Sequence, residues 1–316
     1  MARSLAAFAF STTLVLSASA LVSTSAQAGD LTYLSPDGDI AFTGSYGLTS
    51  IKANEFVWEG KTKVSQLIWK SSYVSTFNAD LRIELPKDWY VNARGTIGLG
   101  GNGHMTDYDW LVPGAPWSDR SKHPDTRLNH YFVGAIEAGR QVISYDGTDV
   151  SLGVGFKYTD VKWAAWGGSY VYTYYDFRDS HGTFDPKEKG ISYRQSWPVP
   201  YLGVNLSHTQ GNWTFAGSLQ GGLAIDAYGT DDHWVRNLRF YDYYFNKPTV
   251  SASASIAYAL RENISFFVSG SFDKSFRARA DTKAVDTTTG ATAWYKDGAG
   301  GDFRSTTVSV GLKGTF

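Results

Sequence analysis

The sequence predicts an all-β protein, a ten-stranded antiparallel transmembrane β-barrel with extended extracellular loops. Apolar and polar residues alternate along many segments, which places successive side chains on opposite faces of a strand. Aromatic residues make up 16% of the 316 residues, and 33 are Gly, a mixture typical of strands joined by tight turns. Short turns also alternate with long polar segments. A membrane barrel needs this pattern, because one strand face meets lipid and the other lines the lumen.

The first segment, residues 1–28, has the features of a signal peptide. Arg3 precedes an apolar stretch that runs from Leu5 to Leu21, and the triplet "AQA" that ends at Ala28 fits a signal-peptidase site. We therefore expect a mature chain of residues 29–316 that forms a single barrel domain. The alternative is an uncleaved anchor helix, which the Ser and Thr residues within the apolar run and the cleavage triplet disfavour.

Composition narrows the class of protein further. The formal net charge is -1, which argues against nucleic acid as a partner, because such proteins carry a basic excess. The chain has no Cys, which excludes thiol catalysis, zinc–thiolate sites and disulfides. No stretch after the signal peptide reaches the roughly 18 apolar residues of a spanning helix. An exported chain of this kind is either soluble or a barrel, and a Gram-negative envelope is its natural setting.

Three segments carry the clearest alternation, and in each the large apolar residues share one face. Those residues are Ile40, Phe42, Tyr46 and Leu48; Trp89, Val91, Ala93, Ile97 and Leu99; and Val308, Val310, Leu312 and Phe316. A soluble sandwich also alternates in this way. The C-terminal Phe316 favours the barrel, because it resembles the sorting signal of outer-membrane barrels.

The connections are of two kinds. Four short turns are expected near residues 86–88, 145–147, 210–212 and 261–263. Five long polar segments cover about 52–62, 100–127, 167–190, 227–246 and 279–301. Together they predict ten strands with both termini on the short-turn side, as in outer-membrane barrels with external loops. Pro198 and Pro200 fall outside these connections and suggest a disturbed start to one strand.

Two short motifs in the predicted external loops carry the candidate chemistry. "GNGHMTDYDW" places Asp107 and Asp109 two residues apart, and "AYGTDDHW" does the same for Asp231 and His233. On an extended chain this spacing puts both side chains on one face, about 6–7 Å apart. Asp231 would fix the tautomer of His233, whose free nitrogen would take a proton from water. The Asp107–Asp109 pair would hold that water and share a proton, and the water would attack an amide carbonyl.

Each motif alone is weak, because acidic loops are also common as solvated surface. A zinc or calcium site is a further alternative, but neither an HExxH nor an EF-hand spacing is present. His104, His123 and His130 are interpreted as hydrogen-bonded surface groups rather than ligands. We therefore expect no bound metal and no cofactor.

The order of the motifs resembles the omptin family of outer-membrane proteases. "KTKVSQLIWK", "GNGHMTDYDW", "SDRSKHPDTRLN", "GGSYVYTYYDFRD", "PYLGVNLSH", "DDHW" and "GLKGTF" follow one another between about residue 30 and residue 316. The resemblance implies a ten-stranded barrel in the outer membrane, with an active-site groove that faces the extracellular side. The family's aspartate pair and aspartate–histidine pair fall on Asp107 and Asp109, and on Asp231 and His233.

The resemblance also implies cleavage next to basic residues, which acidic side chains at the bottom of the groove select. One of these corresponds to Glu55. The other falls on Gly229, so this sequence departs from the family pattern there. Asp119 and Asp232 are alternative sources of negative charge, although Asp232 is equally well interpreted as a solvated neighbour of the dyad.

Family members need lipopolysaccharide for activity and bind its phosphates with cations on the outer face of the barrel. Lys247 corresponds to one such position, whereas Asp160 and Ser196 replace two family arginines. Lys162 and Arg194 lie close by in the sequence and are candidate substitutes. Lipopolysaccharide is therefore expected as an activator rather than as a cofactor.

Two functional hypotheses remain at this point. The first is an endopeptidase, expected as a monomer, that acts on peptides or proteins. The alternative is a non-enzymatic outer-membrane barrel, either an adhesin or a small porin. A ten-stranded lumen is largely filled by side chains, which counts against a diffusion pore.

Overall fold

The structure, a computed structural model, describes residues 39–316, so the expected signal peptide lies outside the described residues. This part of the chain is all-β, as predicted. No helix within it is long and apolar enough to cross a membrane. Its thirteen strands are β1 (Ile40–Glu59), β2 (Thr62–Leu85), β3 (Trp89–Gly98), β4 (Asn102–Asp109), β5 (Asp119–Tyr145), β6 (Thr148–Tyr172), β7 (Ser180–Gln210), β8 (Trp213–Ala224), β9 (Ala227–His233), β10 (Leu238–Tyr244), β11 (Lys247–Arg261), β12 (Ile264–Asp286) and β13 (Thr292–Thr315).

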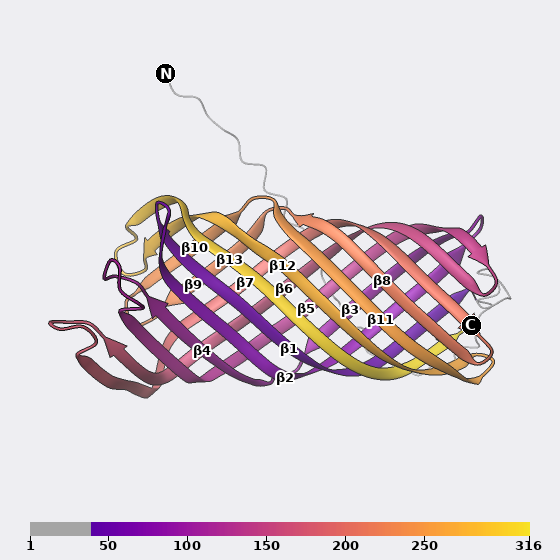
Figure 1. Cartoon of the computed structure of the whole chain (residues 1–316), viewed down its shortest axis with the longest axis horizontal. Coiled ribbons are helices and arrows are strands. Elements are labelled where there is room, and N and C mark those ends of the chain that lie inside the picture. The colour runs from indigo at the N-terminus through magenta and orange to yellow at the C-terminus, as the bar shows by residue number, and fades with distance from the viewer. Residues whose placement is uncertain (1–38) are drawn as a thin grey trace, which may run out of the picture. The chain divides into compact units, whose positions relative to one another are not determined.

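The thirteen strands form one antiparallel sheet that returns on itself at two levels (Figure 1). One ring runs through β7, β6, β5, β3, β2, β1, β13, β12, β11 and β8, and β8 pairs with β7 again. The second ring replaces β3, β11 and β8 by β4, β10 and β9. Each ring holds ten strands, which confirms the predicted number.

The additional elements arise because three of the ten strands are interrupted between the two levels. The breaks lie between β3 and β4, between β8 and β9, and between β10 and β11. Each break contains a residue with positive φ, namely Gly100 at 124°, Asp226 at 49° and Asn246 at 50°. Gly, Asp and Asn adopt this conformation most readily, so the local sequence permits the chain to change direction there.

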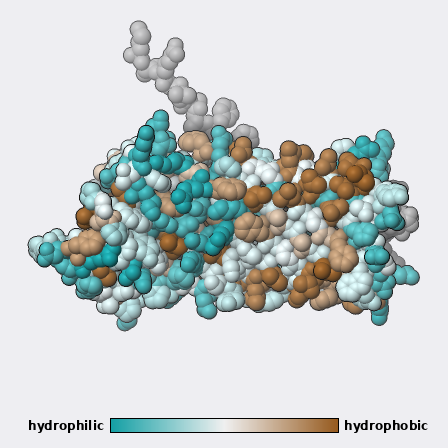
Figure 2. All heavy atoms as spheres, in the orientation of Figure 1, coloured by the Kyte–Doolittle hydropathy of each residue, from teal (hydrophilic) through white to brown (hydrophobic). Residues whose placement is uncertain are grey.

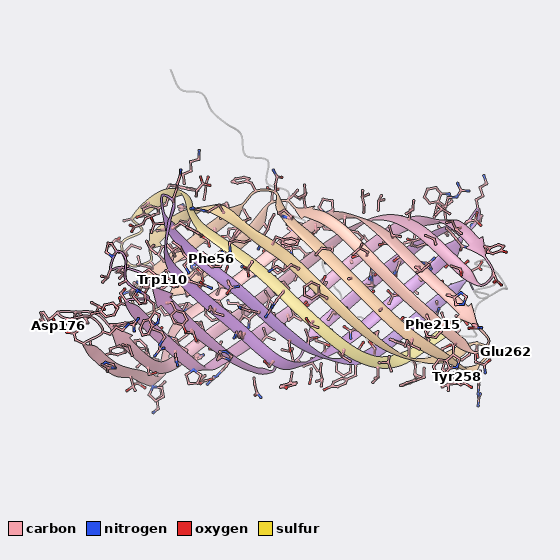
Figure 3. The ribbon with its side chains drawn as sticks, in the orientation of Figure 1. Phe56, Trp110, Asp176, Phe215, Tyr258 and Glu262 are labelled. Atoms are coloured by element: carbon pink, nitrogen blue, oxygen red, sulfur yellow. The ribbon has the colours of Figure 1, made fainter. Side chains whose placement is uncertain are left out.

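The two ends of the barrel differ as the connections predicted. The four short turns lie at one end, where Phe316 donates its backbone N–H to the Ile40 carbonyl at 2.8 Å. Tyr258 and Glu262 lie at this end, and Trp110 and Asp176 lie at the other (Figure 3). The expectation of five long loops was wrong in detail. Most of those residues extend the strands, and only short connections such as 60–61 and 173–179 are left.

Exposed apolar side chains gather on the half of the barrel that carries the short turns, on the face that Figure 2 shows. Strands on other sides of the ring carry exposed apolar residues as well, such as Phe132, Leu152 and Leu206, so these side chains form an apolar belt. The faces predicted from alternation point outward there, with Phe42 49%, Ile97 49% and Val310 45% exposed. Burying such a surface in lipid is favourable, whereas exposing it to water is not. The belt therefore marks the membrane-spanning level, and the second ring of strands lies beyond it.

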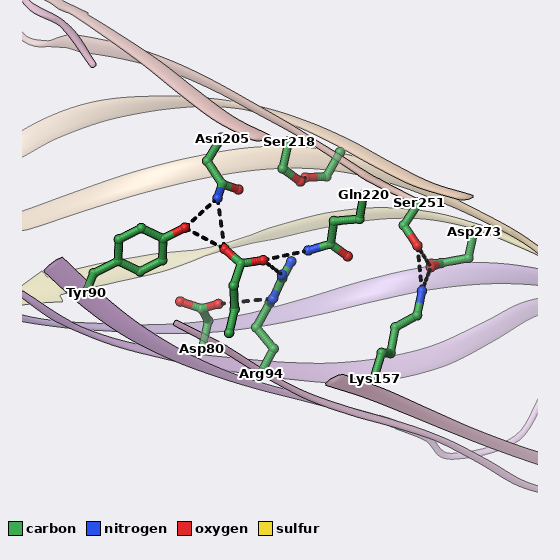
Figure 4. Close-up of polar contacts among 11 residues, drawn as sticks. Asp80, Tyr90, Arg94, Lys157, Asn205, Ser218, Gln220, Ser251 and Asp273 are labelled. Carbon is green, nitrogen blue, oxygen red and sulfur yellow. Dashed lines mark hydrogen bonds and ion pairs between the residues drawn. The ribbon is translucent and has the colours of Figure 1, made fainter. Parts of the chain in front are cut away.

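The lumen at the belt level is filled by a polar network (Figure 4). Glu137 accepts hydrogen bonds from Tyr90 at 2.7 Å, Asn205 at 2.9 Å and Gln220 at 3.2 Å. Arg94 lies 3.8 Å from the same carboxylate.

A second ion pair joins Lys157 to Asp273 at 2.6 Å, and Ser251 donates to the same carboxylate at 2.7 Å. An aromatic layer, in which Tyr131 and Trp197 contact Phe303, lies next to the Lys157–Asp273 ion pair. These layers leave a cavity of about 10 Å³ beside Lys157, no more than one water molecule requires.

The prediction for the two prolines of β7 was wrong. Pro198 and Pro200 lie inside β7 rather than at its start. β7 pairs with β9 up to Ser196 and with β8 from Tyr201 onward. Because the partner changes between these two residues, the missing proline N–H groups fall where the ladder is already interrupted.

Candidate active site

The first candidate pair lies on β4, which is held between β2 and β5. Asp107 is opposite Leu67 of β2, whose side chain is buried in the lumen, so the strand alternation turns Asp107 and Asp109 inward. Ser65 donates a hydrogen bond to Asp107 at 3.2 Å. The pair was expected in a loop, but a paired strand positions it and limits its movement.

The second candidate pair lies on β9, which like β4 belongs to the second ring of strands, here called the upper ring, beyond the apolar belt. Asp231 Oδ2 and His233 Nε2 are 2.5 Å apart, and both residues are buried. The ring of Phe240 lies edge-on to the imidazole with centroids 5.5 Å apart. The i, i+2 spacing therefore gives the shared face and the direct contact that the proposed dyad requires.

A residue that the sequence did not single out completes the contacts of the imidazole. Arg236, in the turn after β9, donates its Nη2–H to Nδ1 of His233. Arg always carries its protons, so Nδ1 acts as the acceptor and Nε2 keeps the ring proton toward Asp231. Nδ1 is thus the basic nitrogen of this site.

The structure brings the two pairs together across the upper end of the lumen. The charge of Asp231 acts on Asp107, the charge of His233 acts on Asp109, and the charge of Arg236 acts on both. Withdrawal from water raises the pKa of Asp107, and the neighbouring Asp109 charge raises it further. Withdrawal from water is also the main cause that raises the pKa of Asp109. Two such carboxyls favour a state in which they share one proton.

Glu55 lies on β1, close to the Asp231–His233 dyad. It is 3% exposed, and it is opposite Leu67 on one side and Gly301 on the other. Burial raises the pKa of Glu55 well above its usual value, and the charges of Asp231 and Asp242 raise it further. Asp242 of β10 is a second residue that the sequence did not single out. Its only signal is a lone acid within an aromatic run, "FYDYYF".

Neither expected substitute for the charge missing at Gly229 is free. Asp232 forms an ion pair with Arg239 and accepts a hydrogen bond from Ser192 at 3.3 Å. It is buried, so its interpretation as a solvated neighbour was wrong. Asp119 accepts the backbone N–H of Thr173 at 3.0 Å and holds the connection after β6.

The placement of Lys247 on the outer face was wrong. Lys247 is 1% exposed, and its Nζ lies 4.8 Å from the ring centroid of Tyr244 and 5.4 Å from that of Trp197. The outward residues of β11, such as Ile256 and Tyr258, have even numbers. Because β11 alternates without a bulge between these residues and Lys247, the odd-numbered lysine faces the lumen.

Asp160 and Ser196, the positions expected from the resemblance to replace two arginines, belong to a polar cluster with His130, Lys162 and Arg194. Asp160 forms an ion pair with Arg194, and its Oδ1 lies 2.8 Å from Nε2 of His130. Lys162 is opposite Arg194 in the ladder, and Ser196 is opposite Asp160. His130 is thus a hydrogen-bonded surface group, as predicted.

The other two of the three histidines interpreted as surface groups, His123 and His104, differ in exposure. His123 was expected on the surface but is buried, with Nε2 2.9 Å from Ser121. His104 is exposed on β4. Within residues 39–316, no three His, Asp or Glu side chains are arranged to hold a metal ion.

Comparison with known proteins finds similarity to outer-membrane proteases along the whole described chain. The Omptin family model matches residues 37–316. Outer membrane protease OmpP of Escherichia coli (strain K12) is 27% identical over 309 residues, which cover 96% of this chain and 98% of OmpP. The plasminogen activator of Yersinia pestis is 26% identical over 288 residues, 90% of this chain and 91% of the activator.

Among solved structures, the crystal structure of outer membrane protease OmpT from Escherichia coli is 26% identical and superposes with a TM-score of 0.85. The alignment covers 89% of this chain and 98% of OmpT. The family match therefore spans both rings of strands and both candidate pairs, and the chain belongs to the omptin family.

Proposed function

We propose that this outer-membrane protein is an endopeptidase that cleaves next to basic residues at the extracellular mouth of its barrel. The observation that carries the proposal is the 2.5 Å contact between Asp231 and His233, with the Asp107–Asp109 pair facing it. Protease relatives over nearly the full length of the chain support the reaction class. The filled lumen at the belt level counts against a porin.

The proposed reaction uses water as the nucleophile. Asp231 accepts the Nε2–H of His233 and thereby holds the ring in the tautomer whose Nδ1 can accept a proton. Nδ1 takes a proton from a water molecule that Asp107 and Asp109 hold, and the resulting hydroxide forms a bond to the carbonyl carbon. When the C–N bond of the tetrahedral intermediate breaks, the imidazolium returns the proton to the leaving amine. No acyl-enzyme forms.

Arg236 limits this reaction in the substrate-free protein. Its guanidinium occupies the Nδ1 position and is attracted by both carboxyls of the pair. The bond to His233 has to break before Nδ1 can accept a proton from water. Arg236 is exposed in a turn, so this movement does not disturb the strands.

The proposal is tested with refolded full-length barrel and a peptide library, in detergent with and without lipopolysaccharide. Wild-type protein should cleave, whereas Asp231→Ala and His233→Ala should lose about 10²–10⁴-fold in kcat/KM. A heat-dependent gel shift of the folded barrel controls for misfolding. Equal cleavage by wild type and both variants would refute the dyad, and loss of activity in a chelator with rescue by zinc would favour a metal mechanism.

Dependence on lipopolysaccharide is part of the proposal. Lys247 cannot supply the phosphate contacts from inside the lumen, so the outward-facing Lys162 and Arg194 are the candidates, beside His130. Activity that rises on addition of lipopolysaccharide in wild type, but much less in Lys162→Ala/Arg194→Ala, is the expected result. Equal activation of both proteins would place the contact elsewhere.

A further inference from the structure

The position of Gly229 explains why the chain can dispense with an acid there. Gly229 lies on β9 between Gln195 of β7 and Asp242 of β10, in direct register with both. Asp242 in turn is opposite Thr282 of β12. Directly opposite residues of antiparallel strands point to one face. Gln195, Gly229, Asp242 and Thr282 therefore form one row across four strands, and all four positions face the lumen.

Asp242 occupies the space beside Gly229. A Cβ added at Gly229 would lie 3.2 Å from Cβ and 3.3 Å from Oδ2 of Asp242. Such contacts are tighter than ordinary van der Waals packing, so a side chain at Gly229 would press on the Asp242 carboxylate. β9 therefore carries no acid at position 229, and β10 carries one directly opposite, at position 242.

The row of Gly229 meets Glu55 across the lumen. Glu55 is opposite Gly301 of β13. A Cβ at Gly301 would lie 2.6 Å from the Tyr244 hydroxyl and 2.9 Å from Gln195 Nε2. Side chains of β7 and β10 thus reach the backbone next to Glu55, and the charges of Asp242 and Glu55 act on each other strongly enough to raise the pKa of Glu55.

Several buried polar atoms in this part of the lumen have no hydrogen-bond partner within residues 39–316. They are Glu55 Oε2, Gln195 Oε1, Asp231 Oδ1, the Tyr244 hydroxyl and the Thr282 hydroxyl. Three of the five are acceptors only, and all five residues that carry them are nine-tenths or more buried. Leaving such groups unpaired costs about 1–3 kcal/mol each, so this part of the lumen is suited to a ligand rich in donors.

The chemistry of that ligand follows from the charges. Asp242 is 2% exposed, and with Glu55 it offers two carboxyls and no cation of its own on the residues of the row. A guanidinium has five N–H donors and an ammonium has three. A positively charged side chain would satisfy the acceptors and stabilise both carboxylates in their charged form.

We propose that Asp242 is a specificity-determining residue, and that together with Glu55 it holds the basic side chain of the substrate next to the scissile bond. This inference rests on the proposed endopeptidase function. It implies that the glycine at position 229 does not weaken the preference for basic residues, because the charge has moved to the facing strand.

The test compares peptides that carry Arg, Lys or citrulline at the same position, since citrulline has the shape of Arg without its charge. Asp242→Asn should lower kcat/KM for the Arg peptide about 10- to 100-fold, the value of one charge-assisted hydrogen bond. Cleavage of the citrulline peptide should stay within about twofold. Asp281→Asn, a neighbouring acid on β12 that does not belong to the row, is the matched control and should change neither rate.

Relocating the charge gives a second test. Gly229→Asp/Asp242→Gly should recover part of the Arg-over-citrulline preference that Asp242→Gly loses. An equal loss for the Arg and citrulline peptides in Asp242→Asn would overturn the proposal, because Asp242 would then act on the fold or on catalysis.

A binding measurement separates this proposal from the proposed function. Uncleavable Arg and citrulline peptides are titrated against folded His233→Ala protein with and without Asp242→Asn. Tighter binding of the Arg peptide that depends on Asp242 supports the pocket even if no peptide is cleaved. Equal binding of both peptides to His233→Ala would overturn the pocket even if wild-type protein is an active protease.

Discussion

The two levels of the barrel differ in how their lumenal carboxyls are paired. At the belt level, Glu137 accepts three hydrogen bonds and Asp273 holds Lys157. Beyond the belt, Glu55 and Asp231 each keep one buried oxygen without a partner in residues 39–316. Seven of the ten strands run through both levels, with the same alternation. The difference indicates that fully paired carboxylates maintain the lumen, whereas carboxyl oxygens without a partner are kept for a substrate and its chemistry.

The largest effect is expected from the aspartate pair of the upper level. Asp107→Asn/Asp109→Asn removes the carboxylates that hold the water, so kcat/KM should fall by about 10³-fold or more. Urea unfolding in detergent should show no loss of stability, because these carboxyls repel each other in the native state. A variant that retains a tenth of wild-type activity would show that the pair does not hold the water.

At the lower level the same logic predicts a loss of stability and little loss of activity. Lys157→Met removes the cation and leaves Asp273 without its ion pair. Breaking a fully buried pair costs about 3–5 kcal/mol. Because the Asp273 side chain is 30% exposed, we expect a loss of about 2 kcal/mol in the free energy of unfolding. Unchanged stability would remove the distinction between the two levels.

The preference for basic residues should depend on pH. Burial raises the pKa of Asp242 to about 7, and Glu55, Asp231, Tyr193 and Tyr244 are the titratable groups that face it. The carboxyl is neutral below this pKa and charged above it. The ratio of kcat/KM for Arg over citrulline peptides should therefore rise about tenfold between about pH 6 and about pH 8. A ratio that stays constant over this range, or one that changes equally in Asp242→Asn, would contradict the assignment.

The smallest effect is expected from Arg236. Its hydrogen bond to His233 is worth about 0.5–1.5 kcal/mol and has to break before water can bind. Arg236→Ala should therefore raise kcat/KM about two- to tenfold, measured on a citrulline peptide so that charge at the specificity pocket does not interfere. A decrease of tenfold or more would show that the guanidinium contributes to the reaction.

The sequence predicted features that depend on local periodicity. Ten strands, the short-turn end and the outward faces of residues such as Phe42 and Val310 are confirmed, because alternation and turn chemistry are local properties. The spacing of Asp231 and His233 also placed both on one face of a strand. The outer-face prediction for Lys247 followed from the resemblance alone, whereas the alternation of side chains along β11 assigns this residue to the lumen.

Other features were beyond the sequence because they depend on ring closure. Asp242 lies 187 positions after Glu55 in the chain, and the two meet only because β10 pairs with β12, β12 with β13 and β13 with β1. The long polar segments were interpreted as loops because polar residues dominate them. In the structure most of these residues form strands with one solvent-exposed face, where polar side chains are stable.

The most direct measurement makes the same substitution at each level of the barrel. Cleavage of an Arg peptide and urea unfolding are compared for Asp231→Asn and Asp273→Asn. Asp231→Asn should abolish cleavage and leave the free energy of unfolding unchanged, whereas Asp273→Asn should lower the free energy of unfolding and preserve cleavage by the folded protein. Cleavage that survives in Asp231→Asn, or is lost equally in folded Asp273→Asn, would contradict the separation of chemistry from support.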